Sequence, residues 1–208
     1  MVGTVNSFYI GIIATVIATA LGTLAALGLS RPHMPYKGLI MAILISPMIV
    51  PLIITAAGMF FFYARINLVY TFTGVILAHV ALATPFVVIT VTATLVGFDM
   101  NMVKAAQSLG AKPMRTFFKV IMPLILPGII SGALFAFITS FDEVVIVMFM
   151  ASIDQLTIPK QMWAGIRQEI SPVILCMATC LVLLSIFLLT TVELLRRRSE
   201  KLRGIKAR

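Results

Sequence analysis

Five long apolar runs constrain this chain more than any other feature of its sequence. They extend over residues 7–29, 39–63, 74–98, 124–150 and 173–195. A helix needs roughly 20 mainly apolar residues to cross a hydrocarbon core of ~30 Å, so each run is long enough for one crossing. Since 61% of the 208 residues are hydrophobic and 11% are charged, little remains for a separate soluble domain. We expect an all-α integral membrane protein in which residues 1–208 form one transmembrane domain with five spans.

The sequence lacks the motifs that hydrolyse nucleotides or hold catalytic metals. It has no glycine-rich loop ending in Gly-Lys-Ser/Thr, no paired metal-ligand motif and no Gly-x-Ser-x-Gly elbow. We therefore expect no catalytic residue, no metal and no cofactor in this chain. Any energy source would be another subunit or an ion gradient.

The basic residues predict how the chain is oriented. Thirteen of the 16 fall in the segments after the first, third and fifth runs: Arg31, Lys37, Lys104, Lys112, Arg115, Lys119, Arg196, Arg197, Arg198, Lys201, Arg203, Lys206 and Arg208. The other side receives only Arg65, Lys160 and Arg167. Basic loops stay in the cytoplasm, so we expect a cytoplasmic C-terminus with a basic tail at 196–208, and contact with anionic lipid instead of nucleic acid.

An odd number of spans places the N-terminus outside. Residues 1–6 carry no basic residue and no signal-peptide n-region that would explain its translocation. A further span upstream, lost by truncation or by a misplaced start codon, would explain this, and so would insertion with the help of neighbouring subunits.

Residues 99–122 are the longest polar stretch between the runs. Asp99 or Asn101 can cap a helix, Gly110 suits its end, and Pro113 suits the first turn of a second short helix. The pattern predicts a helix, a turn and a helix on the cytoplasmic face.

Small and apolar residues in this loop suit docking. Ala105 and Ala106 form a small, flat side, and Leu109, Phe117 and Phe118 are apolar anchors of the kind that fill a groove. The alternative interpretation is an amphipathic loop that lies on lipid headgroups.

Two acids, Asp142 and Glu143, lie within the fourth run. An ionisable residue inside a membrane costs roughly 2.5 to 3.5 kcal/mol or more, so it needs a reason. If the segment is helical, Thr139 shares a face with each acid and Ser140 shares one with Glu143. These four residues are candidates for a transport pathway; the alternatives are pairing with a neighbouring helix and a position near the outer interface.

Prolines interrupt several runs, at Pro47, Pro51, Pro85, Pro123 and Pro127. An interior proline removes a hydrogen bond and kinks its helix. The pair Pro47 and Pro51 therefore predicts a bent element, either in a gate or simply for packing.

The loop resembles a known family. The residues on which the resemblance rests are Ala105-Ala106, Leu109-Gly110-Ala111, Phe118, Ile121, Pro123 and Leu126-Pro127-Gly128-Ile129. Together they are similar to the EAA loop of permease subunits of binding-protein-dependent ABC importers, and the similarity extends over nearly the whole chain. It departs at Lys104, where the family has Glu, and at Met122, where it has Leu. Relatives normally carry six spans, and the one missing here is the first.

The resemblance implies the type I ABC importer permease architecture in the bacterial inner membrane, with loop 99–122 coupling to a cytosolic ATPase dimer that binds the ATP. It also implies a second permease subunit and an extracytoplasmic solute-binding protein. Coupling would use Lys104, Ala105, Ala106, Leu109, Gly110, Phe117 and Phe118. The charge at Lys104 implies either a complementary ATPase cleft or coupling through the small and apolar residues.

The segment Ser140-Phe141-Asp142-Glu143 resembles the spermidine/putrescine branch, where an acidic pair occurs at this point. A polyamine carries at least two ammonium groups and suits such a site, but iron, thiamine, phosphonate and amino-acid-derivative systems share much of the pattern. A rival from another class is a secondary carrier or channel for a small cation that uses His79, Asp142, Glu143 and Glu193. The absence of an inverted repeat and the presence of the polar loop argue against that rival.

Overall fold

The computed structural model describes residues 2–31, 34–96, 100–168 and 172–202, and these residues form helices and connections without any strand. The helices are α1 (Val2–Leu29), α2 (Lys37–Ile49), α3 (Leu52–Arg65), α4 (Phe72–Val96), α5 (Met100–Ser108), α6 (Pro113–Thr116), the π-helix η1 (Phe117–Ile121), α7 (Met122–Phe141), α8 (Val145–Met150), α9 (Ile158–Gln168) and α10 (Pro172–Leu202). The all-α prediction is confirmed.

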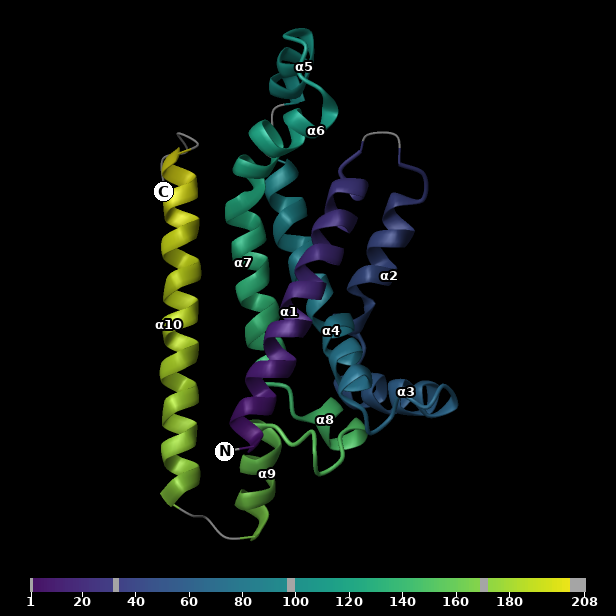
Figure 1. Ribbon diagram of the computed structural model, residues 1–208, viewed down its shortest axis with the longest axis vertical. Helices are drawn as coiled ribbons and strands as arrows, with labels where there is room; N and C mark the ends of the chain where they lie inside the picture. The colour runs from purple at the N-terminus through teal and green to yellow at the C-terminus, as the bar shows by residue number, and fades with distance from the viewer. Residues whose placement is uncertain (1, 32–33, 97–99, 169–171, 203–208) are drawn as a thin grey trace.

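The long helices run roughly along one axis of the molecule (Figure 1). Helices α5 and α6 lie at one end, together with the connection from α1 to α2 and the end of α10. We call this the α5 end. The N-terminus, α3, α8 and α9 lie at the opposite end, called the α8 end. The described parts of the three segments that are rich in basic residues thus share the α5 end, as their distribution predicted.

The centre of the molecule is formed by α1, α4 and α7, which pack on one another over most of their length. Small residues allow this close approach. A Cβ atom added at Gly22 of α1 would lie 2.6 Å from Cβ of Val87, and one added at Gly132 of α7 would lie 3.0 Å from Cα of Val87. Helices in membranes associate through such small-residue contacts because lipid supplies little hydrophobic driving force between them.

The predicted span over 39–63 does not form one straight helix. Helix α2 ends at Ile49, α3 begins at Leu52, and the two are bent by 105°. The bend follows from Pro51, because a proline forces the preceding residue out of the helical region. Val50 accordingly has φ −70° and ψ 134°. The two prolines did predict a bent element here.

The prediction of a span over 124–150 is wrong in its extent. The apolar helical segment begins earlier, at Pro113, and ends at Phe141. Helix α8 is a separate element at the α8 end. The two acids therefore lie in the break between α7 and α8, and not inside a membrane helix as the apolar run suggested.

Among the described residues, three helical segments are long and apolar enough to cross a membrane: Val2–Leu29, Phe72–Val96 and Pro113–Phe141. The bent pair α2 and α3 gives a fourth if it is counted as one span. The predicted fifth run lies in α10, whose described apolar part is Leu175–Thr191.

Candidate functional site

The turn after α5 is closed by local hydrogen bonds. The N–H of Ala111 donates to the carbonyl of Ala106 at 3.0 Å, and the N–H of Gly110 donates to that of Gln107 at 2.9 Å. These two bonds form a Schellman motif, which requires a left-handed residue at the helix end. Gly110 has φ +78°, as expected for that position. The predicted end of the first short helix is confirmed.

The second short helix begins where Pro113 predicted it would. Lys112 is extended, Pro113 occupies the first turn of α6, and the N–H of Thr116 donates to the carbonyl of Lys112 at 3.0 Å. Asp99 lies outside the described residues, and Asn101 lies within α5 instead of capping it. The predicted order of helix, turn and helix is therefore confirmed, and of the two predicted cap residues only Asn101 can be placed, in the first turn of α5.

A π-helical turn joins this loop to the long α7. The N–H of Met122 donates to the carbonyl of Phe117, which is five residues back. Pro123 follows directly, and a proline ring displaces the carbonyl four residues before it. Single π-turns of this kind often lie at functional positions in helices. Helices α6 and α7 thus form one continuous helical segment, Pro113–Phe141, with η1 as a widened turn between them.

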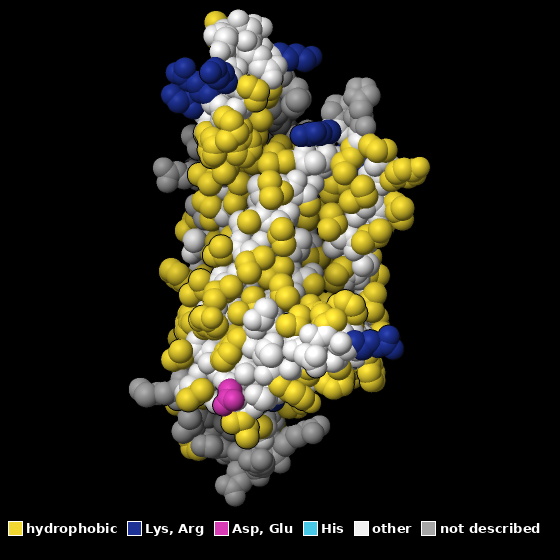
Figure 2. All heavy atoms as spheres, turned by 45° about the vertical axis from the view of Figure 1, so that its right-hand side comes forward, with side chains coloured by type: hydrophobic (Ala, Val, Ile, Leu, Met, Phe, Trp, Pro, Cys, Tyr) yellow, Lys and Arg dark blue, Asp and Glu magenta, His cyan; other side chains and the backbone are white. Residues whose placement is uncertain are grey.

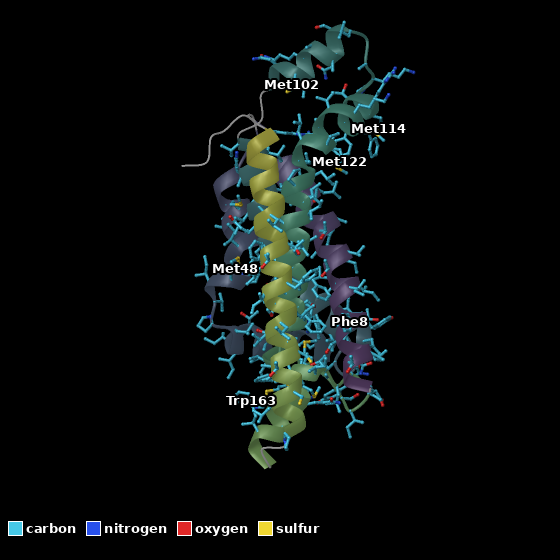
Figure 3. All side chains as sticks on the ribbon, turned by 90° about the vertical axis from the view of Figure 1, so that its left-hand side faces the viewer. Phe8, Met48, Met102, Met114, Met122 and Trp163 are labelled. Carbon is cyan, nitrogen blue, oxygen red and sulfur yellow. The ribbon has the colours of Figure 1, made fainter. Side chains whose placement is uncertain are left out.

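The α5 end exposes apolar side chains beside cations. Leu109 is 89% exposed, and Met114, Phe118 and Met102 are also exposed. Figure 3 shows Met102 and Met114 beyond the end of the bundle. Figure 2 shows Lys and Arg side chains gathered at this end, next to hydrophobic ones. The cations of the loop are Lys104, Lys112, Arg115 and Lys119, and residues 100–121 include no acid.

The predicted coupling residues are close together in this segment, but they are not equally accessible. Lys104, Ala105, Leu109, Gly110 and Phe118 are exposed, whereas Ala106 and Phe117 are half-buried. The rings of Phe117 and Phe118 meet edge to face, with centroids 5.1 Å apart. The segment thus presents exposed apolar side chains, among them Leu109 and Phe118, next to exposed cations.

The two adjacent acids have different environments. Asp142 ends α7, where its N–H donates to the carbonyl of Ile138 at 3.0 Å, and it is exposed. Glu143 is buried, and its Oε1 accepts a hydrogen bond of 2.8 Å from the N–H of Ile146. One carboxylate is thus available to a ligand, and the other is used within the protein.

The other two predicted pathway residues lie in the last turn of α7. Ser140 is buried, and its hydroxyl is hydrogen-bonded to Nδ1 of His79 at 2.8 Å. Thr139 is half-buried. The four predicted pathway residues therefore lie together at the end of α7 opposite to the coupling residues.

Contacts from distant parts of the chain hold the α8 end together. The Asn6 side chain donates to the carbonyl of Asp154 at 2.7 Å and to that of Leu156 at 3.0 Å, and the Ser7 hydroxyl accepts from the N–H of Ile158 at 2.9 Å. These bonds join the start of α1 to the segment that leads into α9.

Lys160 was missed as a functional candidate. Its ammonium donates to the carbonyls of Val147 and Ala151, and burial lowers its pKa from the ordinary value. No local pattern in the sequence predicts these two bonds.

No metal centre is found in the described part of the chain, where no group of three or more His, Cys, Asp or Glu residues could hold an ion.

A bundle of apolar helices with an exposed amphipathic loop at one end and an acid at the other is the architecture of a membrane-spanning transport subunit. Residues 18–201 match the family described as the binding-protein-dependent transport system inner membrane component, and the chain belongs to that family.

The chain is similar in sequence to several polyamine transport permeases. The chain is 30% identical over 196 residues to the spermidine/putrescine transport system permease protein PotC of Haemophilus influenzae, covering 94% of this chain and 76% of that protein. It is 28% identical to the protein of the same name in Escherichia coli K12, of which it covers 74%. It is 30% identical over 181 residues to the putrescine transport system permease protein PotI of Escherichia coli K12, covering 83% of this chain and 64% of that protein.

Solved structures confirm the fold. The chain superposes on an amino acid ABC transporter crystallised with histidines with a TM-score of 0.67, at 18% identity, covering 94% of this chain and 92% of the other. It superposes on an inward-facing MetNI methionine ABC transporter with a TM-score of 0.65, at 18% identity. That superposition covers 99% of this chain and 95% of the other. The architecture is that of an ABC transporter permease, as predicted.

Proposed function

We propose that this chain is a membrane-spanning subunit of an ATP-driven importer, and that the imported solute is a polyamine of the spermidine and putrescine class. The names of the similar permeases support the substrate class. The observation that carries the proposal on this chain is the exposed carboxylate of Asp142 at the break after α7. A carboxylate in partly desolvated surroundings attracts cations more strongly than one in bulk water.

The energy source in this proposal is a cytosolic ATPase dimer, which holds the ATP. In this proposal the chain itself supplies no catalytic residue and holds no cofactor. The ATPase docks on the segment from α5 to η1, where Leu109 and Phe118 enter an apolar groove and Ala105 allows close approach. Motion of the docked segment passes through η1 into α7, which ends beside Asp142. A single helical segment therefore links the docking surface to the pathway.

The α5 end faces the cytoplasm in this proposal, and so does the C-terminus. The exposed Arg31 and Lys37 and the four cations of the loop favour this orientation. The α8 end then faces the extracytoplasmic space, where a solute-binding protein delivers the substrate. A second permease subunit completes the pathway, and Thr139 and Ser140 lie beside it at the end of α7.

Reconstitution tests this function directly. The chain is inserted into liposomes with a candidate second permease and ATPase, and ATP hydrolysis is measured after addition of a binding protein loaded with spermidine. Hydrolysis and spermidine uptake should both rise, while the same binding protein without ligand should raise neither. Uptake by the chain alone, driven by an ion gradient without ATP, would contradict the importer. Stimulation by iron, thiamine or an amino acid, but not by a polyamine, would contradict the substrate class.

A further inference from the structure

Helix α8 is held at its two ends by side chains of opposite charge. At its start, the Glu143 carboxylate accepts a hydrogen bond of 2.8 Å from the N–H of Ile146. At its end, the Lys160 ammonium donates to the carbonyl of Val147 at 3.2 Å and to that of Ala151 at 3.0 Å. The first N–H groups of a helix lack partners within it, and Glu143 supplies one here, whereas the Val147 carbonyl already accepts from the N–H of Ala151 at 3.1 Å and Lys160 adds a second donor to it. A negative charge at the start and a positive charge at the end also match the helix dipole.

The helix between these two charges is tightly packed. Ile146, Val147 and Met150 are 0% exposed, and α8 packs against α3 and α4. The Met150 carbonyl also accepts a hydrogen bond of 2.9 Å from the N–H of Tyr70. A helix of six residues is too short to be stable by its own backbone bonds, so its position depends on these contacts.

The position of α8 also determines where Asp142 lies. Only Glu143 and Val144 separate Asp142 from the first residue of α8, and the chain there is not helical. Asp142 is thus held between the end of α7 and a short helix whose anchors are Glu143 and Lys160. If either anchor is lost, α8 can shift and carry the exposed carboxylate with it.

We propose that Glu143 and Lys160 are positioning residues that fix α8 from its two ends, so that Asp142 alone of the acidic pair meets the transported cation. This inference rests on the proposed function for the role of Asp142. It divides the adjacent acids: Asp142 contributes its charge to the pathway, and Glu143 contributes a hydrogen-bond acceptor to the fold. It also assigns a role to Lys160, which lies 17 positions further along the chain.

Uptake measurements distinguish the two acids. In the reconstituted transporter at saturating spermidine-loaded binding protein, Asp142→Asn should lower the uptake rate about tenfold, as expected for loss of one charge-assisted contact. Glu143→Gln should keep the rate within about twofold, because its amide oxygen still accepts the bond from Ile146. Glu143→Ala should abolish most uptake. Asp154→Asn, which removes an exposed acid from the same end, is the matched control and should leave uptake unchanged.

Thiol labelling reports the position of α8 without any substrate. Met150→Cys is introduced together with Cys176→Ala and Cys180→Ala, which remove the native thiols. A membrane-impermeant maleimide should label the thiol introduced at position 150 slowly, because the side chain at that position is buried. Adding Glu143→Ala or Lys160→Met should speed this labelling about tenfold, whereas Lys160→Arg, which keeps donors for the two carbonyls, should not. Met148→Cys is the matched control, since position 148 is already exposed.

The outcomes separate the alternatives. If Glu143→Gln lowers uptake as much as Asp142→Asn while labelling at position 150 stays slow, Glu143 acts through its charge on the substrate and the inference is overturned. It is also overturned if neither Glu143→Ala nor Lys160→Met changes the labelling. If the transporter does not take up polyamines, the proposed function is refuted. The labelling test of Glu143 and Lys160 remains valid in that case, because labelling needs no substrate.

Discussion

Nδ1 of His79 and the hydroxyl of Ser140 lie 2.8 Å apart and join α4 to the last turn of α7. Both side chains are buried, with 1% and 5% of their surfaces exposed. Removing one partner of a hydrogen bond in such apolar surroundings lowers the stability of the fold, because the remaining polar group is then buried without a partner. The pair therefore fixes α7 just before the break that carries Asp142.

Removing this bond should destabilise the protein. We expect Ser140→Ala to lower the free energy of unfolding by about 1–3 kcal/mol, because His79 keeps a buried nitrogen without its partner. Thermal unfolding of the purified chain in detergent measures the change. Ser131→Ala, which removes the same group from a half-buried position of α7, is the control. If Ser140→Ala leaves the thermal midpoint unchanged but reduces spermidine uptake, Ser140 contacts the substrate and is not mainly structural.

Close contact between α4 and α7 makes a second prediction. A Cβ atom at Gly132 would lie 2.5 Å from Oγ1 of Thr90 and 3.0 Å from Cα of Val87, and the backbone atom cannot turn away. Gly132→Ala should therefore push the helices apart and destabilise the chain by about 1–3 kcal/mol, measured as a lower thermal midpoint.

The control for that prediction is Gly28→Ala. Gly28 is also helical, and an added Cβ there meets nothing within 4 Å. Alanine in a helix is favoured over glycine by roughly 0.5–1 kcal/mol, so Gly28→Ala should be neutral or stabilising. Equal effects of the two substitutions would show that helix contact at Gly132 is not the cause.

Those features that depend on neighbours in the sequence could be predicted. The turn after α5 needed only Gly110 at a helix end and Pro113 in a first turn, and both were found as expected. The apolar runs gave the class of fold for the same reason. The break at Pro51 was indicated, but its 105° bend was not, because a proline sets the local backbone and packing sets the angle.

The break at Asp142 and its consequences could not be predicted. The run from 124 to 150 is apolar throughout, apart from the acids and a few small polar residues, so it reads as one helix. The contacts on either side of this break join distant parts of the chain, such as Ser140 with His79, 61 positions apart, and Lys160 with Val147. Sequence reasoning placed the two acids on different faces of a helix but did not say which of them is exposed, and the structure separates the exposed Asp142 from the buried Glu143.

The left-handed conformation of Gly110 gives a third prediction. A residue with a Cβ atom costs roughly 1–2 kcal/mol in this conformation, and no neighbour within 4 Å adds to the effect. Gly110→Val should therefore distort the end of α5 and weaken ATPase binding, measured by co-purification and by stimulated ATP hydrolysis. Gly110→Asn should retain more activity, since asparagine tolerates the left-handed region. If both variants couple normally, the shape of this turn is not required for docking.

The positive charge of the loop makes the last prediction. Lys104 is exposed on α5, and the described loop contains four cations and no acid. A groove that binds this surface should carry acidic residues, and complementary charges mainly raise the association rate and make it depend on salt. We expect Lys104→Glu to weaken ATPase association by several-fold at low ionic strength and by less at high salt, where charges are screened.

Surface plasmon resonance with the permease in nanodiscs measures this at two salt concentrations. Arg65→Glu reverses an exposed charge at the end of α3, near the α8 end, and should leave ATPase binding unchanged. The sign of the Lys104→Glu effect is informative in itself, because glutamate is the residue that the resembling family carries at this position. Tighter binding of the Lys104→Glu variant would mean that the groove is basic at this point, whereas unchanged binding at both salt concentrations would mean that docking depends on the apolar side chains of Leu109 and Phe118.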